Sequence, residues 1–262
     1  MGSDAASVVL ATTCHDPGGR LAARITERLP LFGRHVDAVV VTVSAATAEA
    51  TGAALQQGDA AVHPEREPAG GLGGIGRSRR DAVARAAEGE PAFVLYADLD
   101  HALRWAGDDP SDLAAALAAV RRCDFTVIGR SPAAIAALPG TLRETENLVN
   151  RVFAHLTGHA WDLMSGVRGM SLAAAEAIVD GCREDSIGND TAWPMFVLRS
   201  GRLRAGYHES AALRYEDTAQ FAEPGDVDAW RRRLESDPAM WVRRLEIARL
   251  QVEAMAPYAV AG

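Results

Sequence analysis

The stretch that decides the fold is AFVLYADLDHALRW, residues 92–105. It begins as an apolar run typical of a buried strand and stops at two aspartates, Asp98 and Asp100, one residue apart. We expect the strand to continue through Asp100, so that both carboxylates stand at its carboxyl end. Ligands of open parallel sheets bind just beyond the carboxyl ends of the strands. This stretch therefore predicts a binding edge as well as a strand.

Strands and helices alternate over the first half of the chain. Apolar runs predict further buried strands at residues 7–14, 37–44, 59–65 and 124–131. Between the strands, apolar spacing and alanine-rich sequence predict helices at residues 19–29, 45–58, 77–89 and 110–123. The alternation predicts an α/β fold in which helices sandwich a mostly parallel central sheet.

After residue 131 the pattern becomes mainly helical. We expect helices within residues 142–158, 165–181 and 188–201, a returning strand in 202–216, and an arginine- and tryptophan-rich helical tail at 226–256. We therefore predict one α/β domain over residues 1–225. Residues 226–262 would form a helical C-terminal extension packed on it.

Composition excludes several classes of protein. The net charge of the 262 residues is -8, so no basic field is available to bind a nucleic-acid backbone. No lysine occurs, which excludes a Walker lysine and a Schiff-base lysine. The three cysteines lie far apart, as expected for reduced thiols of a cytoplasmic protein. No apolar run approaches the roughly 18 residues of a membrane span, and the N-terminus lacks the features of a signal peptide.

The paired aspartates predict a metal site. Two neighbouring carboxylates repel each other unless a cation neutralises them. Mg²⁺ and Mn²⁺ accept carboxylate oxygens, and Mg²⁺ commonly combines one or two carboxylates with phosphate oxygens of a ligand. Asp98 and Asp100 therefore predict a site for Mg²⁺ or Mn²⁺ carrying a diphosphate. The alternative is a polar loop in which both aspartates are merely solvated.

A glycine-rich turn precedes this strand. In GLGGIGRSRR, residues 71–80, Gly73 and Gly74 would let backbone amides approach phosphates, and Arg77, Arg79 and Arg80 add positive charge. The turn does not directly follow the first strand, as a dinucleotide fingerprint would, and no G-K-[ST] follows, as in a P-loop. A flexible turn without a ligand is the alternative.

The order of these motifs resembles family-two inverting glycosyltransferases of the GT-A fold, most closely the polyprenyl-phosphate mannosyltransferase branch. In that family a G-L-G turn and an alanine-rich helix precede a strand ending in D-A-D-L-Q-H, which corresponds here to YADLDH, residues 96–101. Asp98 takes the place of the second family aspartate, Tyr96 that of the first, and Asp100 that of the glutamine. These positions hold the metal and the diphosphate of a nucleotide sugar.

The resemblance continues downstream and spans roughly residues 7–217. GRSP at 129–132 and the helix at 142–158 are similar to a G-S-R motif and an arginine helix, which would bring Arg130 and Arg143 near phosphates. WDLMSGVRG at 161–169 is similar to D-x-x-S-G-F-R. The residues that match this second motif are Asp162, Ser165, Gly166 and Arg168.

The sequence also departs from the family pattern. The first strand ends in His15 and Asp16 instead of N-E, and Asp16 would contact the base or ribose. The second strand ends in VSAAT, without the acid that contacts the nucleotide in the family. This departure points to an altered donor or to loss of activity. The missing membrane anchor favours a soluble acceptor over a lipid.

The resemblance implies a metal-dependent transfer of a sugar from a nucleotide-diphosphate donor to a hydroxyl acceptor. Asp190 and then Asp162 are the candidates for the base that takes the acceptor proton. Asp190 could instead cap the helix that follows it, and Asp162 could make a structural hydrogen bond. A nucleotidyltransferase and a non-catalytic binding protein of the same fold stay open as alternatives. The arginine-rich tail is a candidate contact for a homo-oligomer.

Overall fold

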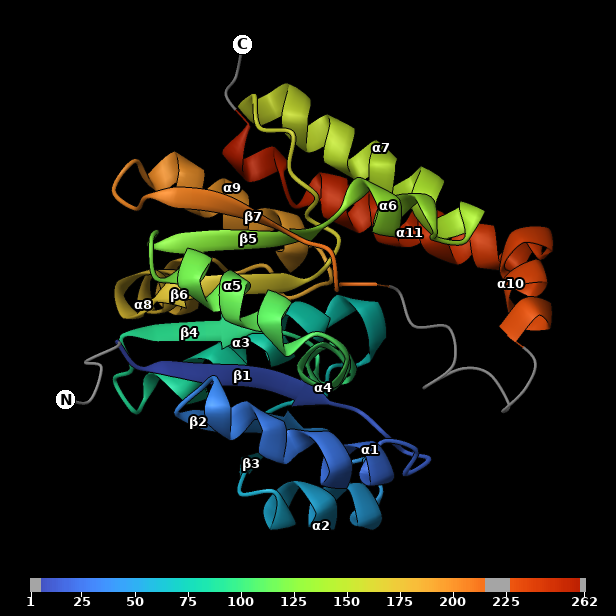
Figure 1. Cartoon of the computed structure of the whole chain (residues 1–262). Helices are drawn as coiled ribbons and strands as arrows, with labels where there is room; N and C mark the ends of the chain where they lie inside the picture. The colour runs from blue at the N-terminus through green and yellow to red at the C-terminus, as the bar shows by residue number, and fades with distance from the viewer. Residues whose placement is uncertain (1–5, 215–226, 260–262) are drawn as a thin grey trace.

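The structure is a computed structural model that describes residues 6–214 and 227–259. Seven strands form one sheet in the order β3-β2-β1-β4-β6-β5-β7, with helices on both faces (Figure 1). β6 runs antiparallel to its neighbours β4 and β5, and the other neighbouring pairs are parallel. The strands are β1 (Val8–Cys14), β2 (Ala38–Val43), β3 (Ala61–Pro64), β4 (Phe93–Tyr96), β5 (Phe125–Arg130), β6 (Val167–Ser171) and β7 (Ala205–Ser210). The predicted mostly parallel α/β sheet is confirmed.

Two apolar clusters, one on each face, attach the helices to the sheet. The first joins the sheet to α1, α2, α4 and α5, and the second joins it to α3, α7, α8, α9 and α11. The helices are α1 (Ala22–Arg28), α2 (Glu49–Gln57), α3 (Ile75–Ala87), α4 (Leu99–Asp108), α5 (Pro110–Val120), α6 (Pro132–Ala136), α7 (Gly140–Thr157), α8 (Leu172–Gly181), α9 (Asn189–Ser200), α10 (Val227–Ser236) and α11 (Pro238–Glu253). Short 3₁₀ turns lie at η1 (Leu29–Arg34), η2 (Gly71–Gly73) and η3 (Ala256–Tyr258).

β1 shows why the strands read as continuous apolar runs. Its residues alternate between the two clusters: Val8 and Leu10 belong to the first, Val9 and Ala11 to the second. A strand covered on both faces buries every side chain, so its sequence does not alternate. Burial of each larger apolar side chain contributes roughly 1.5–3 kcal/mol.

The prediction that the fourth strand continues through Asp100 is wrong. β4 ends at Tyr96, Asp98 stands at the N-cap of α4, and Asp100 lies in the first turn of that helix. Leu99, Leu103 and Ala106 of α4 are buried, so the ADLDHALRW segment follows helical spacing from Leu99 onward. The apolar run ends because the chain turns from a strand into an amphipathic helix.

β6 is a strand that the sequence did not predict. It is five residues long, includes Arg168 and Gly169, and directly precedes α8. Such a short strand with an arginine and a glycine offers no clear apolar pattern. Pairing with β4 and β5 stabilises β6 as a strand, although its own sequence has no strand pattern.

The C-terminal extension is helical as predicted. α11 packs against α7 and α9, and α10 packs against α11 and α7 (Figure 1). The boundary between residues 225 and 226 stays a prediction, since residues 215–226 lie outside the described part of the chain. The end of the strand expected at 202–216 also lies there. Within the described residues, no helix combines the length and the apolar character needed to cross a membrane.

The position of β6 can be tested at Gly169. A Cβ at Gly169 would approach Val120 Cγ2 of α5 to 2.2 Å, whereas a Cβ at Gly52 in α2 would have no neighbour within 4 Å. We expect G169A to destabilise the protein by about 1–3 kcal/mol through overpacking. G52A should stabilise it by up to about 1 kcal/mol through helix propensity. Urea unfolding of both variants checks this, and a G169A protein as stable as wild type would contradict the packing of α5 on β6.

Candidate functional site

Asp98 lies at the carboxyl edge of the sheet, where β4 ends. Its Oδ1 accepts a hydrogen bond from the Tyr96 hydroxyl at 2.6 Å, and the Thr13 hydroxyl lies 3.5 Å away. Its Oδ2 accepts from Arg79 Nη2 at 2.8 Å. The side chain keeps 29% of its exposure. The predicted aspartate therefore stands at the predicted edge, held on three sides and open to solvent.

Arg79 is the central cation of this site. Its side chain is 8% exposed and forms ion pairs at 2.8 Å with both Asp98 and Asp190. Asn189 Oδ1 accepts a further bond from Arg79 at 3.2 Å. One guanidinium thus joins the first half of α3 to the end of β4 and the start of α9. We call Asp98, Arg79 and Asp190 the Arg79 cluster.

Gly166 closes over the Arg79 cluster. It has a φ of +71°, and a Cβ there would lie 3.6 to 3.9 Å from Arg79 Nη2, Asp190 Oδ1 and Asp98 Oδ2. The glycine of the SGVRG segment thus lets the backbone approach all three charged groups. Asp190 is not the N-cap of α9; Gly188 is, and Asp190 lies in the first turn.

The charges of this cluster set the pKa of Asp98. Burial would raise this pKa, but the positive charges of Arg79 and His101 and the hydrogen bond from Tyr96 outweigh it and hold the pKa below its ordinary value. The same carboxylate, together with burial, raises the pKa of Tyr96 well above the usual range. Asp98 is therefore ionised and Tyr96 is neutral at physiological pH.

The three arginines of the glycine-rich stretch have different partners. Arg77 pairs with Glu67 and donates to Pro68 O, while Arg80 donates to the carbonyls of Cys182 and Glu184 and pairs with Asp185. Both hold neighbouring loops instead of facing Asp98. Helical spacing within the predicted helix distinguishes Arg79 from the other two arginines. Arg79 lies on the same buried face as Gly76, Val83 and Ala86, where an unpaired arginine would be costly.

A cleft runs along the carboxyl ends of β1, β2 and β3. It consists of two cavities, of about 730 and 470 Å³, that meet because His15 and Arg243 line both. The larger lies over the loop after β1, with Trp230 on its far side. The smaller lies over residues 44–46 after β2 and the glycine-rich stretch at Gly70 and Gly71. We call these two cavities the β1–β3 cleft.

The glycine-rich stretch borders this cleft mainly through Gly70 and Gly71, both with positive φ. Gly73 belongs to the 3₁₀ turn η2 and Gly74 is the N-cap of α3. A Cβ at Gly74 would come within 1.8 Å of Ala69 O, so only glycine fits there. The phosphate role of Gly73 and Gly74 stays a prediction, and the geometry assigns Gly74 a structural need of its own.

Asp16 lines the cleft but directs its carboxylate into its own loop. Its oxygens accept from the amides of Arg20 and Leu21 at 3.0 and 2.8 Å and from the Thr51 hydroxyl at 2.7 Å. These contacts fix the turn between β1 and α1. A direct contact of Asp16 with a base or ribose would have to displace or share them.

A smaller pocket of about 120 Å³ lies beside His101 of α4. Ser165 and three arginines, Arg130, Arg214 and Arg244, also line it, together with Glu146, which pairs with Arg130 and Arg244. His101 is close enough to Asp98 to lower the pKa of that carboxyl. We call this cavity the Arg130 pocket.

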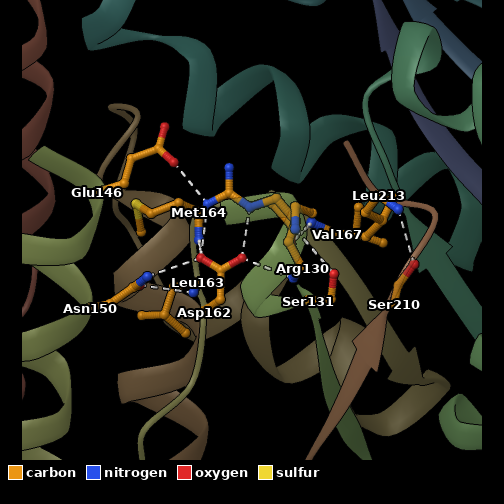
Figure 2. A network of polar contacts seen from close by, with 12 residues as sticks. Arg130, Ser131, Glu146, Asn150, Asp162, Leu163, Met164, Val167, Ser210 and Leu213 are labelled. Atoms are coloured by element: carbon orange, nitrogen blue, oxygen red, sulfur yellow. Dashed lines mark hydrogen bonds and ion pairs between the residues drawn. The ribbon is translucent and has the colours of Figure 1, made fainter. Parts of the chain in front are cut away.

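Arg130 anchors a buried ion network beside this pocket (Figure 2). Its guanidinium donates to Asp162 through Nε at 2.8 Å and Nη2 at 2.9 Å, and to Glu146 at 2.8 Å. Glu146 also accepts from Arg244 of α11 at 2.5 Å. We call these four side chains the Arg130 network. It ties β5, α7 and the loop before β6 to the C-terminal extension.

Asp162 is fully engaged in this network. Besides Arg130, its carboxylate accepts from Asn150 Nδ2 at 2.9 Å and from the Met164 amide at 3.2 Å. Burial would raise its pKa, but the hydrogen bonds and charge of Arg130 hold it below the ordinary value. A carboxylate bound in this way is a poor base, so the structure supports the structural alternative for Asp162.

Three further candidate site residues from the sequence, Arg143, Ser165 and Arg168, have partners within the protein. Ser165 donates to Ile128 O, and Arg143 lies at the start of α7, bonded to Glu144 and near the carbonyls that end α6. Arg168 is fully buried and donates to the carbonyls of Val167, Leu163 and Asp190. Burial lowers the pKa of Arg168 to about 10. Arg168 positions the start of α9, and only Ser165 of the three borders a pocket.

The metal prediction can be tested against these donors. Asp98 and Asp100 stand at the N-cap and second position of a helix, so their side chains leave it on roughly opposite sides. No group of three or more His, Cys, Asp or Glu side chains gathers as a metal site in the part of the chain that the structure describes. Asp98 lies at this edge, and a carboxylate has about four lone-pair positions. These residues fit a site with one protein carboxylate, completed by water and phosphate oxygens.

Comparison with known proteins supports the fold. The chain matches crystal structures of glucosyl-3-phosphoglycerate synthase from Mycobacterium tuberculosis, one with a TM-score of 0.55, 13% identity, and coverage of 92% of this chain and 81% of that chain. A complex of the same enzyme with Mn²⁺, UDP and phosphoglyceric acid gives a TM-score of 0.56, 14% identity, and 92% and 78% coverage. The structure of a further mycobacterial protein gives a TM-score of 0.55 and 14% identity, and the match covers 92% of this chain and 75% of that chain. No family model and no curated protein matches the sequence. The chain therefore has the GT-A-type fold that the sequence motifs suggested.

The structural role of Asp162 predicts an acid-sensitive stability. We expect D162N to lose about 3–5 kcal/mol at pH 7, because it leaves Arg130 with one carboxylate fewer in a buried network. The folded pKa of Asp162 is lowered, so its contribution is present above the ordinary pKa of about 3.9 and is lost as the pH falls. Wild type should therefore lose stability more steeply below about pH 4 than D162N.

Urea unfolding between pH 7 and pH 3 measures both effects. D180N is the matched control, because Asp180 is an exposed aspartate at the end of α8. Equal stabilities of D162N and D180N at pH 7 would refute the structural assignment.

Proposed function

We propose that this protein is a metal-dependent glycosyltransferase that moves a sugar from a nucleotide-diphosphate donor to a hydroxyl acceptor. The observation that carries the proposal is the position of Asp98. An ionised, partly exposed carboxylate stands at the carboxyl edge of the sheet, the edge along which the β1–β3 cleft runs. The fold match to an enzyme crystallised with Mn²⁺ and UDP-glucose supports the same class.

The β1–β3 cleft suits the nucleotide of the donor. It extends over the ends of three parallel strands, which is where open α/β sheets bind nucleotides. The diphosphate would then lie between the cleft and Asp98. A divalent metal held by Asp98 would neutralise the charge that develops on the departing diphosphate.

The Arg130 pocket suits the acceptor. Its volume of about 120 Å³ and its three arginines support a small acceptor that carries an anionic group next to its hydroxyl. Phosphoglyceric acid, which occupies the related enzyme, has this character. Transfer forms a bond from the acceptor oxygen to the anomeric carbon and breaks the bond from that carbon to the diphosphate oxygen.

Asp190 is the proposed base for the acceptor hydroxyl. It is the carboxylate that lies next to Asp98 beneath Gly166, and Arg79 and Gln251 hold its two oxygens at 2.8 and 3.4 Å. Arg79 positions Asp98 and Asp190 together, which is the kind of orientation that supplies much of enzymatic acceleration. The proton released by the acceptor would pass to Asp190.

One observation favours a non-catalytic alternative. Where the family has an acid after the second strand, Ser44 Oγ lies 2.8 Å from His15 Nδ1 and 3.0 Å from Thr47 Oγ1. These groups offer hydrogen bonds to a nucleotide but no carboxylate. A nucleotidyltransferase is the other alternative, and it would prefer triphosphates.

A binding panel separates these functions. We expect calorimetry to show that Mn²⁺ alone binds weakly, because Asp98 is a single ligand, and that one of UDP, GDP, ADP or CDP binds at least tenfold more tightly with Mn²⁺ present. D98N should abolish the effect of Mn²⁺, whereas D100N, on the other side of the helix start, should retain it. Binding only of triphosphates would support the nucleotidyltransferase. Binding of no nucleotide by wild type would refute the proposal.

The role of Asp190 predicts a split between binding and turnover. With the nucleotide sugar selected by the panel and 3-phosphoglycerate as acceptor, D190N should lower kcat by about 10²–10⁴-fold, because the base is lost. Its affinity for the nucleoside diphosphate should stay within about threefold. D185N, which changes a partly exposed aspartate paired with Arg80, is the control. A D190N enzyme with wild-type turnover would remove Asp190 from the reaction.

A further inference from the structure

Arg243 of α11 reaches the β1–β3 cleft from the C-terminal extension. It is the residue, with His15, that lines both cavities of the cleft. From there it faces the loop after β1 on one side and the glycine-rich stretch at Gly70 and Gly71 on the other. The extension therefore contributes a cation to the part of the edge where the nucleotide is proposed to bind.

Arg243 differs from the arginine next to it in the chain. Arg244 is bonded to Glu146 and belongs to the Arg130 network. Arg243 is exposed, and its guanidinium makes no hydrogen bond or ion pair with any residue that the structure describes. On the same helix, Arg249 is paired with Glu246 and Glu253. Arg243 is thus a cation whose charge remains available to a ligand.

The acids near the cleft do not neutralise Arg243. Asp16 directs its oxygens to the amides of Arg20 and Leu21 and to Thr51. Glu65, at the end of β3, accepts from Ser78 at 2.8 Å. A diphosphate placed in the cleft would therefore find a guanidinium without a competing carboxylate bonded to it. Guanidinium groups bind phosphate oxygens through two parallel hydrogen bonds.

The position of Arg243 is fixed by the packing of α11. The helix packs on α7 and α9, and the adjacent Arg244 is held by Glu146. A side chain on such a support can hold a ligand with little movement of the backbone.

We propose that Arg243 binds the diphosphate of the nucleotide-sugar donor, so that the C-terminal extension completes the donor site. This inference rests on the proposed function. It adds a protein cation to the diphosphate site from a part of the chain that the sequence motifs do not include. It also predicts that Arg243 affects donor binding through the diphosphate and not through the base or the sugar.

Calorimetry with R243Q and R249Q tests the proposal. The two substitutions remove the same charge from exposed arginines of the same helix, but Arg249 lies outside the cleft cavities. UDP with UMP, and GDP with GMP, serve as probes in the presence of Mn²⁺. We expect R243Q to bind the nucleoside diphosphate at least about tenfold more weakly than wild type does. This is the effect expected when one hydrogen bond to a charged group is lost. Affinity for the matching monophosphate should change by less than about threefold.

Two further measurements make the result specific. R249Q should keep both affinities, and R243K, which retains a point charge, should recover part of the loss. Because Arg243 is exposed and has no partner within residues 6–214 and 227–259, the melting temperature of R243Q should stay within about 2 °C of wild type. Equal diphosphate affinities of R243Q and R249Q, or equal losses for diphosphate and monophosphate, would overturn the role of Arg243 and leave the proposed function standing. If wild type binds none of UDP, GDP, ADP and CDP in the presence of Mn²⁺, both proposals fall.

Discussion

The buried ion pairs of Arg79 are the interaction on which the rest of the site depends. A guanidinium that is 8% exposed joins Asp98 at the end of β4 to Asp190 at the start of α9. An unpaired charge at this depth would cost several kcal/mol, so each of the three groups requires the others. The same requirement brings α9 against the sheet edge and explains why the backbone above the cluster is a glycine, Gly166. The ion pairs of Arg79 therefore fix the distance between the end of β4 and the start of α9 before any ligand binds.

A second set of charges, the Arg130 network, connects the sheet edge to the C-terminal extension. The Arg130 network joins β5 and the loop before β6 to α7, and through Arg244 it reaches α11. The Arg79 cluster organises residues within the sheet domain, while the Arg130 network attaches the extension to it. This division of roles explains how Arg243, one residue before the anchored Arg244, reaches the cleft. Arg244 thus helps to hold the extension on the domain, while Arg243 lines the cleft.

Local sequence was sufficient for most of the fold and for the position of Asp98 at the edge of the sheet. The buried strands before residue 131, most of the helices and the edge position of Asp98 follow from apolar spacing and from the abrupt end of the FVLY run. β6 could not be predicted, since Arg168 and Gly169 are stabilised in a strand only by the neighbours β4 and β5. The partners of individual side chains could not be predicted either. Arg77, Arg79 and Arg80 are the same residue type in one short segment, and only the position of Arg79 on the buried face of α3 distinguishes it. Asp162 matched a family motif, but the contacts of Arg130 and Asn150 with it are set by the tertiary fold.

The charges around the cleft offer a physical reason for the absence of an acid after β2. His15, Ser44 and Thr47 form a hydrogen-bonded group at that position, and Asp16 is bonded to its own loop. This group offers a ligand hydrogen bonds and no carboxylate. Phosphates are repelled by carboxylates and attracted by guanidinium groups, so the lack of an acid after β2 and the presence of Arg243 both favour an anionic ligand. Asp98 would oppose such a ligand unless a cation lay between them. On the proposed function, the lack of an acid after β2 and the need for a metal at Asp98 therefore have the same origin, which is the negative charge of the diphosphate.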